Sequence, residues 1–491
     1  MLATGLSAID GSIVATAVPS IVAHLGGFTQ FPWVFSAYLL TMAVTIPLYG
    51  KLADHFGRKR LLIIGSAIFV IGSVAAGFSW NMFSLILFRG LQGVGAGALR
   101  PLTATIAGDL YTVEERARVQ GLLASVWGIS AVIGPLAGGL FTQFLTWRWI
   151  FFVNLPLGIA AIAVVAAYFH EKIEHRNVQI DFAGSGLLVV GIGAIVLTLL
   201  QAGNVWSWTD PRTILTGAGG LVILALFVLR EHRAANPIFP LWILGSRQLA
   251  AATLATLVVG LLTFGVSAYV PTFAQTVFGA TPIVAGALLG LMTIAWPLAA
   301  SISGRIYLKI GFRDTALIGS LLVLAGTGIF CLITQNSPLF AIAAGTITIG
   351  FGFGLISSPM LVGAQSVVDW GRRGVVTGAV TFGQMLGGTL STAIFGSVFN
   401  SALVKWLAAA PASLRGQLPQ PDHAADLIYN SHNAGSAVVA FVRSGLYFAI
   451  HRVDLGMLGV AVVGIFAVLF APRVFTFIAA RELTKTGSAK G

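Results

Sequence analysis

The chain has 491 residues, of which 57% are hydrophobic and only 9% are charged, and its mean hydropathy is +0.91. A soluble domain carries about 25% charged residues, so this composition excludes a soluble globular protein and predicts a membrane protein. The formal net charge is +12. In a soluble chain such an excess would indicate nucleic-acid binding, but here basic loops on one face of a membrane explain it, so no nucleic-acid partner is expected.

Fourteen apolar segments follow one another along the chain, and most approach the about 20 residues that cross about 30 Å of hydrocarbon. They occupy residues 3–23, 32–52, 61–79, 83–108, 120–142, 150–169, 183–202, 213–229, 250–273, 283–304, 314–334, 339–363, 374–400 and 453–471. Most Lys and Arg residues fall on one side of these segments, so the positive-inside rule places both termini in the cytoplasm. We expect an all-α polytopic membrane protein with fourteen transmembrane helices.

Similar features recur at a nearly constant spacing. Gly50 and Gly57 bracket a basic turn, and Gly304 and Gly311 do the same 254 residues later. Loops of any membrane protein carry Gly and Arg, but the shared spacing favours two homologous halves, an architecture known among transporters. We predict a six-helix bundle at residues 1–170, two inserted spans at 171–248 and a second six-helix bundle at 249–472. The second bundle contains a long external loop at 401–450, and a cytoplasmic tail follows at 473–491.

Asp10 is the only carboxylate that the predicted spans place deep inside the membrane. An acidic side chain at the centre of a membrane helix costs about 2.5–3.5 kcal/mol on insertion scales, and it usually marks a functional site. Two interpretations remain: a proton-coupling residue, or a structural ion pair with Arg89. They are compatible, because an ion pair that breaks on protonation is itself a switch.

Arg100 lies on the same predicted helix as Arg89, eleven residues further along. Its charge either adds repulsion against cationic substrates in a central cavity or turns toward the cytoplasmic face. Aromatic and methionine side chains suit varied lipophilic substrates, although most large apolar residues in spans face lipid or a neighbouring helix. The candidates for a substrate cavity are Tyr38, Gln92, Arg100, Trp127, Phe264, Tyr269, Trp296, Phe382, Gln384 and Met385.

Five motifs together resemble the fourteen-span drug:proton antiporter family of the major facilitator superfamily. Residues 50–60 read GKLADHFGRKR, residues 89–95 read RGLQGVG, and Gly128 is followed by GPLAGG at residues 134–139. The stretch IDGSIV at residues 9–14 with Pro19, and WRWIFFVNLP at residues 147–156, are similar to motifs of the fourteen-span family. The resemblance covers nearly the whole chain.

The resemblance implies a proton-coupled secondary exporter of lipophilic drugs or dyes that works by alternating access. The alternative is a dedicated exporter of one metabolite, siderophore or antibiotic. Asp10 and Arg89 would carry proton coupling. A conformational latch would be formed by Gly50, Asp54, Gly57, Arg58 and Asp109, with Arg58 meeting Asp109 and Asp54 at the start of the penultimate span. The motif Gly128, Gly134, Pro135, Gly138 and Gly139 is typical of exporters.

The residues that enzymes, metal proteins and nucleotide-driven pumps need are missing from the sequence. Cys331 is the only cysteine, which excludes a disulfide framework, and the histidines fall at span ends or in loops. No phosphate-binding loop is present. We therefore expect no enzyme activity, no cofactor and no metal. The expected partners are a small lipophilic substrate, protons and the lipid bilayer of an inner cell membrane. We expect a monomer, and the sequence does not indicate whether a periplasmic adaptor takes part.

Overall fold

The computed structural model describes residues 1–25, 32–171, 181–202, 206–234, 237, 241–411, 413–414, 417–418 and 436–473. Over these residues the fold is helical, without a strand beyond the isolated bridge between Ala202 and Trp206. Eleven helices of the described chain are long and apolar enough to cross a membrane. The expected all-α membrane fold is confirmed, while the count of fourteen spans stays a prediction.

The first group of helices fills residues 2–168. It consists of α1 (Leu2–Leu25), α2 (Pro32–Phe56), α3 (Arg58–Gly77), α4 (Met82–Leu110), α5 (Val113–Phe144), α6 (Trp149–Phe152) and α7 (Asn154–Tyr168). Helices α2 and α3 pack against α4, and α1 packs against α5. Asn81 caps α4 by accepting the backbone N–H of Ser84 at 2.7 Å, which fixes where this central helix begins.

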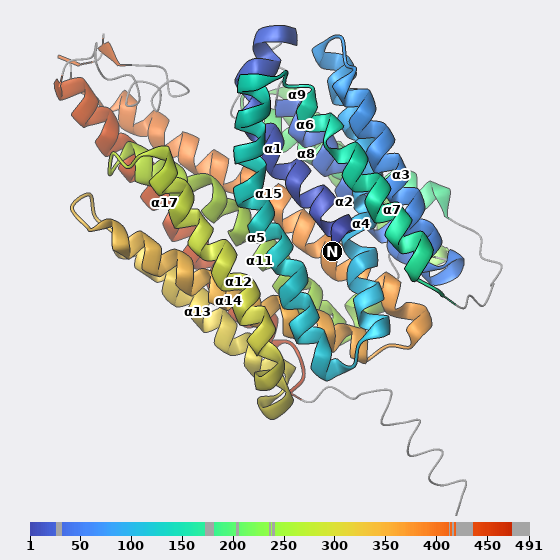
Figure 1. Cartoon of the computed structure of the whole chain (residues 1–491). Helices are drawn as coiled ribbons and strands as arrows, with labels where there is room; N and C mark the ends of the chain where they lie inside the picture. The colour runs from blue at the N-terminus through green and yellow to red at the C-terminus, as the bar shows by residue number, and fades with distance from the viewer. Residues whose placement is uncertain are drawn as a thin grey trace, which may run out of the picture.

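The second group of long helices follows residue 246. It consists of α11 (Arg247–Thr276), α12 (Pro282–Ile310), α13 (Phe312–Leu332), α14 (Leu339–Ser366), α15 (Arg373–Ala408) and α17 (Ser436–Leu469). Helix α14 packs against α12 and α13, and α15 packs against α11 and α17. Figure 1 shows the blue helices α2, α3 and α4 on the opposite side of the molecule from the yellow helices α13 and α14.

Helices α8 (Phe182–Gln201) and α9 (Pro211–Arg233) lie between the two groups in sequence and pack on each other. Helix α8 also touches α2 and α15, so this pair borders both groups. Asp181 caps α8 through the Gly184 N–H at 3.0 Å and pairs with Arg230 of α9 at 3.1 Å. The short helix α10 (Trp242–Gly245) precedes α11.

Two tight turns reflect the repeat seen in the sequence. Gly57 has φ 88° between α2 and α3, and Gly311 has φ 91° between α12 and α13. Side chains other than glycine rarely adopt this left-handed backbone. The turns at these two positions, 254 residues apart, therefore share one backbone conformation.

Helices extend into both ends of the long loop predicted at residues 401–450. Helix α15 continues to Ala408, and α17 begins at Ser436. The reason is an apolar contact between the two extensions: Leu403 and Leu407 of α15 pack with Val438, Val442 and Leu446 of α17. Residues 436–450, which the prediction placed in the loop, are therefore continuous with the last span.

The most extensive contacts between the two groups are α5 against α12 and α2 against α15, and α4 also touches α15. Glycines bring the backbones close at both contacts. A Cβ on Gly50 would lie 2.7 Å from the carbonyl oxygen of Gly374, and one on Gly128 would lie 2.9 Å from that of Thr293. Only glycine permits such an approach, so these positions set how closely the groups can close.

Candidate functional site

A fully buried polar network surrounds Asp10. We call Asp10, Ser73, Arg89, Gln92 and Asn154 the Asp10 network. Arg89 Nη1 lies 2.6 Å from Asp10 Oδ2. The amide nitrogens of Gln92 and Asn154 donate to Asp10 Oδ1 at 2.8 and 3.1 Å. Asp10 and Arg89 both have an exposed fraction of 0%, so an ionised carboxylate here is compensated by one guanidinium and two amide donors.

Every member of the Asp10 network belongs to the first group of helices. Asn154 of α7 also donates to Ser73 of α3 at 3.0 Å, and the Arg89 guanidinium lies 4.1 Å from the ring centre of Tyr38 on α2. Arg89 Nη2 and the Tyr38 hydroxyl have no hydrogen-bond partner among the described residues. The network therefore joins helices within one group. Beside the ion pair, Arg89 Nη2 and the Tyr38 hydroxyl can each still donate a hydrogen bond.

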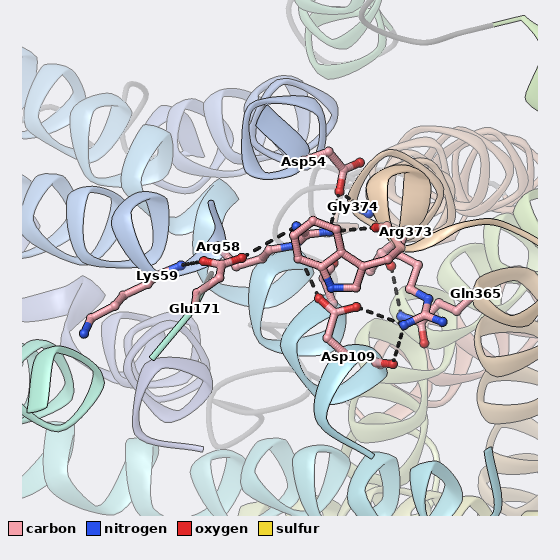
Figure 2. A network of polar contacts seen from close by, with 12 residues as sticks. Asp54, Arg58, Lys59, Asp109, Glu171, Gln365, Arg373 and Gly374 are labelled. Carbon is pink, nitrogen blue, oxygen red and sulfur yellow. Dashed lines mark hydrogen bonds and ion pairs between the residues drawn. The ribbon is translucent and has the colours of Figure 1, made fainter. Parts of the chain in front are cut away.

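A second network lies at the end of α2 and reaches the start of α15 (Figure 2). We call Asp54, Arg58, Asp109, Trp370 and Arg373 the Asp54 network. The Asp54 carboxylate accepts the backbone N–H groups of Gly374 and Val375, both at 2.9 Å. These are free N–H groups in the first turn of α15, where the helix dipole favours an anion.

Arg58 connects Asp54 to the rest of this network. Its guanidinium lies 2.8 Å from Asp54 and 3.3 Å from Asp109, donates to the Trp370 carbonyl at 2.8 Å and lies 3.7 Å from the Trp370 ring centre. Arg373 contacts Asp109 at 3.2 Å from the second group. The Asp54 network thus crosses between the two groups at several points, unlike the Asp10 network.

Sequence reasoning missed several members of this region. Trp370, Arg373, Gln365 and Glu171 were not among the predicted residues. Figure 2 shows Arg373, Gln365 and Glu171 around Arg58 and Asp109, and the Trp370 ring lies against the Arg58 guanidinium. Glu171 lies 3.6 Å from Arg58. Arg373 belongs to a basic pair in the second half of the repeat, which was the available signal for it. The others come from segments distant in the sequence and carry no motif.

The GPLAGG motif lies within α5, and its glycines have different surroundings. A Cβ on Gly134 would collide with the Ser12 hydroxyl of α1, which itself donates to the Ser130 carbonyl at 2.8 Å. Gly138 is buried, whereas Gly139 has open space within 4 Å of a Cβ. The side chain of Pro135 lies outside the described residues. The motif therefore packs α5 on α1, while Gly128 packs it on α12.

The predicted cavity residues do not gather at one place. Tyr38 and Gln92 belong to the surroundings of Asp10. Phe382 and Met385 of α15 pack into a core formed mainly by the first group, and Trp296 lies 5.2 Å from Phe353 within the second group. Arg100, Trp127 and Gln384 come together between the groups. In the rest of the list, Phe264 lies beside Gly388 and Tyr269 lies 5.5 Å from Phe399.

One carboxylate in the interior of a long helix was missed. Asp10 was expected to be the only acid deep inside a span, but α17 begins at Ser436 and carries Asp454 well inside the helix. Asp454 has an exposed fraction of 4%. The apolar segment had been placed at 453–471, which put Asp454 at its edge. Helical packing of residues 436–450 moves this acid into the interior.

The chain is similar to known proteins over most of its length. The family model described as Major Facilitator Superfamily matches residues 1–392. The Multidrug transporter protein MdtP of Bacillus subtilis is 30% identical over 96% of this chain and 93% of its own length. Multidrug resistance protein 3 of the same organism is 32% identical over 84% of this chain and 80% of its own length.

A solved structure has the same fold. The human organic anion transporter MFSD10 aligns with a TM-score of 0.64 at 12% sequence identity, covering 95% of this chain and 97% of its own. At this identity the likeness concerns the arrangement of helices alone. It agrees with the helical fold described above.

Proposed function

Since the chain belongs to the Major Facilitator Superfamily, we propose that it is a proton-coupled secondary exporter of the fourteen-span drug:proton antiporter type. The relatives are transporters and not enzymes, and those named as multidrug transporters support a membrane exporter of small lipophilic substrates. We further propose an inner cell membrane location with both termini in the cytoplasm. The observation that carries the proposal is the pair of buried charge networks, one within a helix group and one between groups.

Asp10 is the proposed proton-binding residue. It is buried with Arg89 among helices of one group, so its charge is a property of that group and not of the contact between groups. Protonation would remove the negative charge that compensates Arg89, and the guanidinium would then need another acceptor, such as water or a carbonyl group. A buried pair that changes its charge in this way links proton binding to a rearrangement of side chains.

The Asp54 network is the proposed latch at the cytoplasmic end. Rocking of the two groups would separate Asp54 from the first turn of α15 and Asp109 from Arg373. The described conformation, with these contacts made, then corresponds to a state that is closed toward the cytoplasm. Alternating access requires such contacts to form in one state and break in the other.

The experiment that tests this function is dye efflux from energised cells that make the protein. A panel of lipophilic dyes of both charges, with ethidium among the cations, is measured with and without an uncoupler. We expect efflux that the uncoupler abolishes and that Asp10→Asn abolishes at equal expression. Efflux that survives Asp10→Asn would remove the coupling role from Asp10. A folded, inserted protein that exports none of the dyes would favour the dedicated metabolite exporter.

A further inference from the structure

Arg100 occupies the contact between the two helix groups. It comes from α4, and its Nη2 donates to Oε1 of Gln384 on α15 at 2.7 Å. Its guanidinium carbon lies 5.3 Å from the ring centre of Trp127 on α5. Arg100 and Trp127 are half-buried, and Gln384 is buried. Three helices from both groups therefore present a cation, an aromatic face and an amide at one place.

No carboxylate of the described residues pairs with Arg100. Asp10 is engaged by Arg89, and Asp54 and Asp109 are engaged by Arg58 and Arg373. Arginine cannot relieve its charge by losing a proton, and an arginine inside a membrane protein normally faces a partner or a water-filled path. The positive charge of Arg100 is thus left without a protein anion beside it.

We propose that Arg100 is an anion-binding residue of the transport path and that the exported substrates are amphipathic organic anions. This inference rests on the proposed export function and names its substrate class. A guanidinium offers a planar fork that matches a carboxylate or sulfonate. The Trp127 ring beside it offers a face for an aromatic or apolar body. A lipophilic cation at the same place would meet a charge of its own sign.

Gln384 adds a link between substrate and conformation. Its carbonyl oxygen accepts from Arg100, and its amide nitrogen has no acceptor among the described residues, so it remains available to the anion. An anion that takes the guanidinium fork competes with the Gln384 oxygen. Because that hydrogen bond crosses between the groups, substrate binding weakens a contact that must break when the groups rock apart.

The test uses inside-out vesicles from cells that make the full chain, energised to give a proton gradient. Uptake of anionic carboxyfluorescein and of cationic ethidium is compared for the wild type, Arg100→Gln, Arg100→Lys and the control Arg212→Gln, which changes an exposed arginine at the start of α9. We expect Arg100→Gln to lower carboxyfluorescein uptake at least tenfold without lowering ethidium uptake. Arg100→Lys should retain part of the anion uptake, and Arg212→Gln should retain all of it.

Two results would overturn the inference. Ethidium uptake by the wild type without carboxyfluorescein uptake would reject the anionic substrate class while leaving the export function intact. An equal loss of both dyes in Arg100→Gln and Arg100→Lys, in protein that remains folded by size-exclusion chromatography, would assign Arg100 a structural role. Uptake of neither dye by the wild type would count against the proposed function itself, and the inference that rests on it would fall with it.

Discussion

The Asp10 network and the Asp54 network both bury charges, but they differ in what they connect. Asp10 and Arg89 lie on α1 and α4 of one helix group, and neither is exposed. The Arg58 side chain is also buried, with an exposed fraction of 1%. Its network, however, runs from α2 and α4 to Trp370, Arg373 and the first turn of α15. Rigid rocking of the groups leaves the first network whole but must break those contacts of the second network that cross between the groups. The first is therefore suited to hold a proton, and the second to hold a conformation.

The largest expected effect is on the Asp10 network. Asp10→Asn leaves Arg89 buried without a counter-charge, and breaking a buried pair in this way costs about 3–5 kcal/mol. Thermal unfolding in detergent should show a clear loss of stability. The double variant Asp10→Asn with Arg89→Gln removes both charges and should recover much of it. A double variant as unstable as the single one would mean that the ion pair is not what Asn disrupts.

The next effect concerns the link between the groups. Asp54→Asn removes the charge that accepts the Gly374 and Val375 N–H groups, and hydrogen bonds to a charged group contribute about 1.5–3 kcal/mol each. Since 1.4 kcal/mol is a factor of ten, amide hydrogen exchange in the first turn of α15 should speed up about tenfold or more.

The second half of the repeat offers a matched control for Asp54→Asn. Asp314 lies just after the equivalent turn and pairs only loosely, at 3.6 Å with Arg313 and 3.4 Å with Arg473. The position equivalent to Asp54 is Leu308, which is 48% exposed. Asp314→Asn should leave exchange in α15 unchanged. Equal acceleration by both variants would show that the effect comes from lost surface charge and not from the crossing contact.

A backbone contact supports the same link. Gly50→Ala places a methyl group 2.7 Å from the Gly374 carbonyl oxygen, which pushes α2 and α15 apart. Overpacking of this kind typically costs about 1–3 kcal/mol. We expect faster exchange at the start of α15 and slower transport, whereas Gly139→Ala has open space and should change neither. If the two alanine variants behaved alike, the close approach of α2 and α15 would not limit closure.

The smallest effect is expected at Asp181 and Arg230, outside both networks. The hydrogen bond from Arg230 holds the pKa of Asp181 below its ordinary value, although Arg230 is half exposed. A lowered carboxyl pKa stabilises the folded state above the unfolded pKa, and this contribution is lost as the pH falls through the folded pKa. Arg230→Gln should lower the melting temperature slightly at pH 7, and this effect should be smaller at pH 3, which lies below the ordinary pKa of an aspartate. An effect that is the same at both pH values would exclude the ion pair as its cause.

The all-helical membrane fold could be predicted from the sequence, because it follows from the length of the apolar segments and from the charge of the loops between them. The meeting of Asp10 with Arg89 could be anticipated since both are charges inside apolar segments. Trp370 and Glu171 could not, because their place beside Arg58 depends on how distant helices pack. Asp454 was missed for another reason: whether it lies at the end or the interior of a helix depends on the contact between α15 and α17, which hydropathy along one segment does not contain.

The most direct test of the different roles of the two networks compares uphill and downhill transport in proteoliposomes. A dye that the wild type exports is followed in two assays, accumulation driven by a pH gradient and counterflow without a gradient. We predict that Asp10→Asn loses accumulation but keeps counterflow, because the groups still rock without a proton to couple. Asp54→Asn should impair both. Accumulation that persists in Asp10→Asn at the wild-type rate would contradict the assignment of proton coupling to the Asp10 network.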